Sequence, residues 1–88
     1  MPERTFDERV DDTILVGSLR LAEFRKVPIR EMVKGHAEQC RLNATDTPRE
    51  DPMHDYWLHR IKRCNVLLLD AKETLRHAAW QALNREVR

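Results

Sequence analysis

The spacing of apolar residues in the second half of the chain predicts a long amphipathic helix over residues 53–87. Apolar side chains there recur at alternating steps of four and three residues: Trp57, Ile61, Cys64, Leu68, Ala71, Leu75, Ala78 and Ala82. Such steps place side chains along one face of a helix that packs over its whole length. At about 1.5 Å per residue, an unbroken helix of this span would be roughly 50 Å long. We therefore expect an elongated molecule.

A matching pattern in the first half predicts a helical arm over residues 6–42. Its apolar seam is Leu15, Leu19, Ala22, Lys26, Ile29, Val33, His36 and Cys40, with Lys26 as the one poor position. Thr5 and Glu8 have the spacing of a capping box, which predicts the start of this helix. Pro28 must kink or break the arm, because it lacks an amide donor and disfavours helical geometry at Val27. No Ser, Thr, Asp or Asn directly precedes Pro28 to cap a new helix, which favours a kink.

A loop rich in turn residues, 43–52 (NATDTPREDP), separates the two arms. It offers two starts for the last helix, the capping box Thr47-Pro48-Arg49-Glu50 and the pair Asp51-Pro52. Folding the chain at residue 47 brings the two seams into register. We therefore predict one all-α domain, residues 1–88, built as an antiparallel helical hairpin whose first arm is kinked or broken near Pro28.

A second apolar row on each arm remains uncovered in a two-helix hairpin. It consists of Val10, Ile14, Gly17, Leu21 and Phe24 on the first arm and Leu67, Ala79, Trp80 and Leu83 on the last. A homodimer forming a four-helix bundle would bury both rows and enlarge a core that 88 residues barely supply. A compact three-helix bundle, broken at Pro28, is the alternative.

The composition of the chain leads to expectations about its cellular location, its origin and whether it is an enzyme. The longest wholly apolar run is Val66–Leu69, so neither a membrane span nor a secretory signal is expected. Two cysteines and an arginine-rich basic set lead us to expect a cytoplasmic protein with reduced thiols, of bacterial or phage origin. Because no nucleophile–base pair, glycine-rich phosphate loop or paired carboxylates are visible, we do not expect an enzyme.

Three kinds of binding site can be read from the residues. The favoured function is an interaction or regulatory module that binds a protein partner, another chain or a second copy, through apolar residues flanked by arginines: Leu21, Phe24, Leu67, Trp80 and Leu83. The first alternative is nucleic-acid binding through basic helical faces: Arg20, Arg25, Arg30, Lys34, Arg60 and Arg63. The second alternative is a zinc or copper site at His36, Cys40 and His54, where the predicted register sets Cys40 opposite His54.

Overall fold

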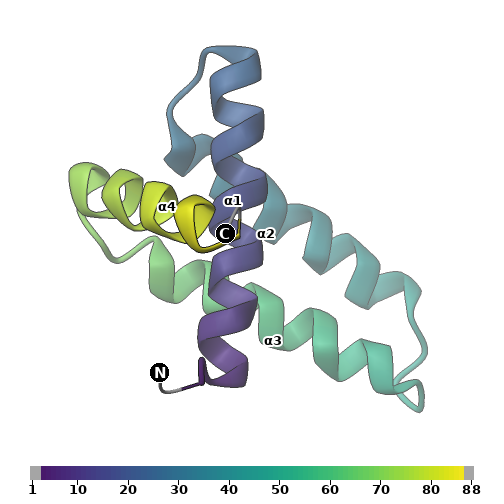
Figure 1. The fold of residues 1–88 in the computed structure, drawn as a ribbon. Helices are drawn as coiled ribbons and strands as arrows, with labels where there is room; N and C mark the ends of the chain where they lie inside the picture. Colours follow the sequence, from purple (N-terminus) through teal and green to yellow (C-terminus); the bar gives the residue numbers. More distant parts are fainter. Residues whose placement is uncertain (1–2, 87–88) are drawn as a thin grey trace.

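The structure, a computed structural model, describes residues 3–86 and contains four α-helices (Figure 1). They are α1 (Phe6–Arg25), α2 (Ile29–Asp46), α3 (Pro52–Leu67) and α4 (Lys72–Glu86). The described residues include no strand, and the predicted all-α class is confirmed.

The start of α1 follows the predicted capping box. The amide of Glu8 donates to Thr5 Oγ1 at 3.1 Å, and the Glu8 carboxylate accepts from the amide of Thr5 at 3.1 Å. Each bond satisfies a backbone donor that a helix start would otherwise leave without an intrahelical acceptor.

Pro28 breaks the first arm, so the expectation of a kink was wrong. α1 closes with Lys26 in the left-handed region (φ 59°), and the amides of Lys26 and Val27 both donate to the carbonyl of Ala22. α2 then starts from Pro28 without a side-chain cap. The proline has no amide to offer a continuing helix, and it excludes helical geometry at Val27 strongly enough to end α1.

The connection between α2 and α3 is shorter than predicted. α2 continues to Asp46, and Thr47 closes it by donating its hydroxyl to the carbonyl of Asn43 at 2.7 Å. Of the two predicted starts for the next helix, the chain uses Asp51-Pro52. The Asp51 carboxylate accepts from the amide of Met53 at 2.9 Å, and proline occupies the first helical position.

The predicted long helix over residues 53–87 is also wrong, because the chain turns between Leu67 and Lys72. Nothing local demands this break, since residues 68–71 contain neither proline nor glycine. A distant side chain supports it. Arg30 Nη1, in the first turn of α2, donates to the carbonyls of Leu68 and Asp70, each at 3.0 Å. These carbonyls directly follow the end of α3 and therefore need hydrogen-bond donors from outside the helix.

The two breaks fold the hairpin back on itself. α2 and α3 form an antiparallel pair, α1 crosses this pair, and α4 packs mainly against α1 and also contacts α2 (Figure 1). The described chain measures 37 × 34 × 22 Å, so the molecule is not the elongated rod that we expected.

The resulting core draws on all four helices. Its largest fully buried side chains are Ile14, Val33, Cys40, Cys64 and Leu75. Val10 and Ile14, from the second apolar row, are buried together with the predicted seam residues of α1. A single chain therefore covers much of the surface for which the sequence suggested a dimer. The far end of that row on α1, consisting of Gly17, Leu21 and Phe24, stays exposed.

Candidate interaction surface

One face of α1 points to solvent although this helix contacts the other three. Gly17, Leu21 and Phe24 follow one another along it at steps of four and three residues. Phe24 is 85% exposed and Leu21 is 46% exposed. Arg9 and Arg25 lie on the same helix, and neither forms an ion pair with a residue in the range 3–86. We call these five residues the α1 surface.

The other predicted partner-binding residues have different surroundings. Leu67 is buried, and Leu83 packs, half-buried, against the core. Trp80 remains 41% exposed, on α4. Two of the five predicted residues therefore belong to one apolar surface on α1, and two belong to the core.

Three of the six predicted nucleic-acid-binding residues, all partly buried, bond to other helices or to the turn after α3. Arg30 bonds to the turn after α3, as described above. Arg63 makes a two-pronged contact with the Asp11 carboxylate, with both N–O distances at 2.8 Å, and so joins α3 to α1. Arg60 reaches from α3 to both α1 and α2.

The remaining three cations do not form a continuous stripe. Arg20 pairs with Glu86 at 3.2 Å, and Lys34 pairs with Glu31 at 3.6 Å. Arg25 alone has no acidic partner among the described residues. A surface that follows a phosphate backbone needs several free cations in line, and these six residues do not supply them.

A polar cluster around Arg60 lies where α1, α2 and α3 meet. Its guanidinium contacts His36 Nε2 through Nε (3.2 Å) and Nη2 (2.9 Å), the Tyr56 hydroxyl (2.9 Å) and the Thr13 hydroxyl (3.2 Å). Because a guanidinium can only donate, His36 Nε2 must accept and the ring proton must sit on Nδ1. Burial and the neighbouring Arg60 charge lower the pKa of His36, so the ring is held neutral.

The structure does not assemble the predicted metal site. His36 and Cys40 are neighbours, with 3.5 Å between Nε2 and Sγ. The His54 ring lies elsewhere, where its Nδ1 is 3.0 Å from the carbonyls of both Ala44 and Thr47. Within residues 3–86 no three His, Cys, Asp or Glu side chains are grouped as metal ligands would be. The prediction was wrong because the α2–α3 register sets His54 opposite Ala44, not opposite Cys40.

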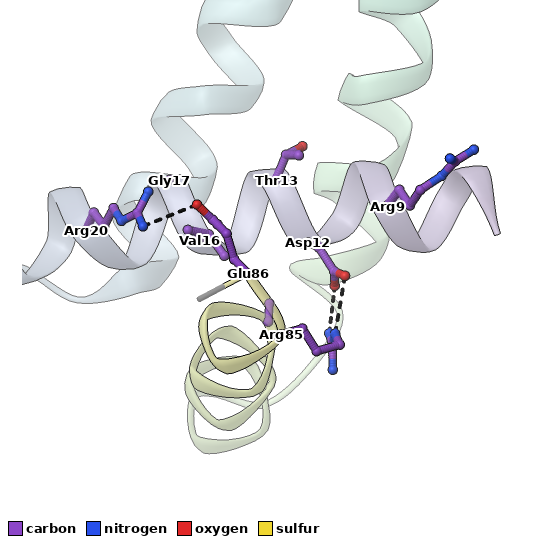
Figure 2. Close-up of a pocket in the computed structure, with 9 residues that line it drawn as sticks. Arg9, Asp12, Thr13, Val16, Gly17, Arg20, Arg85 and Glu86 are labelled. Carbon is purple, nitrogen blue, oxygen red and sulfur yellow. Dashed lines mark hydrogen bonds and ion pairs between the residues drawn. The ribbon is translucent and has the colours of Figure 1, made fainter. Parts of the chain in front are cut away.

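A cavity of about 550 Å³ lies between α1 and α4 (Figure 2). Its charged groups other than Arg9 already have partners. Asp12 pairs with Arg85 at 2.7 Å and Arg20 pairs with Glu86, while Arg9 extends away from both pairs (Figure 2). These ion pairs tie α4 to α1 and leave little uncompensated charge to bind a ligand.

A smaller cavity, about 370 Å³, lies between α1 and α2 and has a different character. Its lining combines apolar, hydroxyl, amide and imidazole groups with one cation: Thr13, Ile14, Gly17, Ser18, Leu21, Arg25, Met32, Gly35, His36 and Gln39. The only two glycines of the chain are both among them. No Asp or Glu side chain in the range 3–86 lines this cavity.

Our sequence interpretation did not identify Thr13, Ser18, Gly35 or the role of Arg60. One signal was available, since two glycines interrupt otherwise strong helical segments. The contacts of Arg60 with His36 and Thr13 join residues 24 and 47 positions apart, and they depend on how the helices pack.

Comparison of the chain with family models, curated proteins and solved structures finds no match. Among the described residues, no helix combines the length and the apolar character needed to cross a bilayer.

Proposed function

We propose that this protein is a non-enzymatic interaction module that binds an amphipathic, acidic helix of another protein on the α1 surface. The exposure of Phe24 is the observation that carries the proposal. Leaving an aromatic ring 85% exposed forgoes the stabilisation that burial would give. Exposed aromatic and aliphatic residues that adjoin one another are typical of interaction sites.

The charges favour an acidic partner over a second copy of the chain. Arg9 and Arg25 each lie eight residues from Gly17, in opposite directions along α1. Two copies crossing at Gly17 would bring Arg9 close to Arg25 if antiparallel, and each arginine close to its own counterpart if parallel. Like charges would meet in either case, whereas carboxylates beside an apolar stripe would complement both arginines.

A synthetic peptide can serve as the probe. It would be a helix of about five turns with leucines at steps of three and four residues and glutamates on both flanks. We expect it to bind the wild-type protein, and Phe24→Asp to weaken that binding about tenfold or more, as for a central aromatic anchor. Fluorescence anisotropy measures the affinity, and circular dichroism checks that the variant stays folded.

Leu69→Asp is the matched control, because Leu69 is also 85% exposed but lies in the turn between α3 and α4. It should leave peptide affinity unchanged, and a peptide flanked by lysines should not bind. Equal losses for the two variants, or equal binding of both peptides, would refute the proposal. Self-association that Phe24→Asp abolishes, measured by native mass spectrometry, would identify a homodimer interface in its place. Binding of duplex DNA with a steep salt dependence would instead favour the nucleic-acid alternative.

A further inference from the structure

We infer that the cavity between α1 and α2 is a binding site for a small carboxylate with an apolar body. The inference does not depend on helix docking at the α1 surface. A volume of about 370 Å³ falls in the range of small-molecule sites. Three independent features of the lining specify the ligand class: bare backbone, free hydrogen-bonding groups and an uncompensated positive charge.

The glycines indicate that something approaches the backbone closely. Gly17 and Gly35 lie inside α1 and α2, neither has a positive φ, and a Cβ at either position would meet no atom within 4 Å. The fold therefore has no need of glycine at these positions, where alanine would make the better helix. A ligand lying against the backbone supplies a reason for both residues.

Two hydrogen-bond donors of the lining, the Ser18 hydroxyl and the His36 Nδ1–H, have no acceptor among the side-chain hydrogen bonds of residues 3–86. Ser18 is 4% exposed and lines the cavity, yet its hydroxyl makes none of the side-chain hydrogen bonds within residues 3–86. His36 also lines the cavity, and its Nδ1–H is the ring group that Arg60 leaves unused. Both groups can donate to an anionic oxygen.

The charge and the apolar side chains of the lining also indicate which ligand the cavity would bind. Among residues 3–86, Arg25 is the one arginine, lysine or acidic residue of the lining, and no carboxylate there neutralises it. The side chains of Ile14, Leu21 and Met32 supply apolar walls. A ligand with one carboxylate and a short hydrocarbon body matches both, whereas an amine would meet Arg25 with the same charge.

Hexanoate is the first probe, with hexanamide and hexylamine as uncharged and cationic controls. The two glycines of the chain give two backbone amide signals in a characteristic region of the ¹H–¹⁵N spectrum, and both lie in the cavity. We expect hexanoate to shift both signals saturably. Hexanamide should bind at least about tenfold more weakly than hexanoate, because it cannot form charge-assisted hydrogen bonds with Arg25. Hexylamine should not bind. Equal shifts from all three probes, or none from hexanoate, would overturn the inference.

Substitution of Gly35 separates a binding role from a structural one. Gly35→Ala and Gly35→Leu should each raise the melting temperature, because both residues are better helix formers, and should weaken hexanoate binding, with leucine the more severe. Asn65→Ala, at an exposed position of α3 outside the cavity, should raise the melting temperature without changing affinity. Undiminished hexanoate binding in Gly35→Leu would place the ligand elsewhere and overturn the inference. Phe24→Asp should retain hexanoate binding, so failure here and failure of helix docking are distinguishable.

Discussion

Arg30 holds the chain turn at Leu68 from a position 38 residues earlier in the sequence. One guanidinium nitrogen donates to the carbonyls of Leu68 and Asp70, each at 3.0 Å. The contact joins the two breaks of the fold, since Arg30 lies directly after the first and Leu68 opens the second. Loss of this side chain should therefore weaken the fold although it leaves the core intact.

We expect Arg30→Ala to lower the free energy of unfolding by about 1–2 kcal/mol, because two carbonyls lose a charged donor. Urea unfolding followed by circular dichroism measures the change. Arg25→Ala is the control, since Arg25 is exposed and has no acidic partner in the described chain; its effect should stay within about 0.5 kcal/mol. Equal effects of the two substitutions would contradict a supporting role for Arg30.

The contact between Asp11 and Arg63 should contribute measurably to the packing of α1 on α3. Both side chains are less than one-fifth exposed and form two parallel hydrogen bonds of 2.8 Å. A double-mutant cycle with Asp11→Asn and Arg63→Met should give a coupling of about 1–2 kcal/mol, between the values of exposed and buried pairs. The exposed pair of Glu38 and Arg41, within α2, should give about 0.5 kcal/mol or less. A coupling no larger than that of the exposed pair would show that this contact adds little.

Stability should fall on mild acidification because His36 is held neutral. Burial and the Arg60 charge lower its folded-state pKa below the ordinary value of 6.5. The unfolded chain therefore binds the proton more readily. The stabilising contribution is complete above the unfolded pKa and is lost as the pH falls through 6.5 toward the folded pKa.

Melting temperatures between about pH 7.5 and 5.5 test this expectation. His36→Gln keeps an oxygen that can accept from Arg60 but cannot titrate, so it should flatten the profile. His77→Gln, at an exposed position of α4, should not. A profile that His36→Gln leaves unchanged would mean that other groups produce the pH dependence.

The two cysteines should be unreactive in the folded protein. Cys40 and Cys64 are both buried and free. Burial raises the pKa of both thiols, that of Cys64 to about 11, with a smaller contribution there from the proximity of Cys40. Little thiolate is therefore present at neutral pH. A thiol reagent such as DTNB should label neither cysteine in buffer and both in concentrated guanidinium chloride, whereas a cysteine introduced by Asn65→Cys should react at once. Rapid labelling of Cys40 or Cys64 in buffer would show that the α2–α3 contact opens readily.

The sequence by itself determined the features that depend on neighbouring residues. The capping box of Thr5 and Glu8, the helix start at Asp51-Pro52 and the interruption at Pro28 all follow from local backbone chemistry. The apolar steps of three and four also identified most residues that the core buries, because a helix keeps one face together wherever it lies.

Only the tertiary structure decided how the helices divide and which side chains meet. Residues 68–71 contain neither proline nor glycine, and the turn there is supported by Arg30, which donates to its carbonyls from another helix. The shorter connection between α2 and α3 set the register that separates His54 from Cys40, and the packing of α1 on α3 brought Arg60 and Arg63 into contact with α1. Hydrogen bonds between distant residues compete with helix continuation on nearly equal terms. Their outcome depends on the whole packed arrangement, which no local pattern encodes.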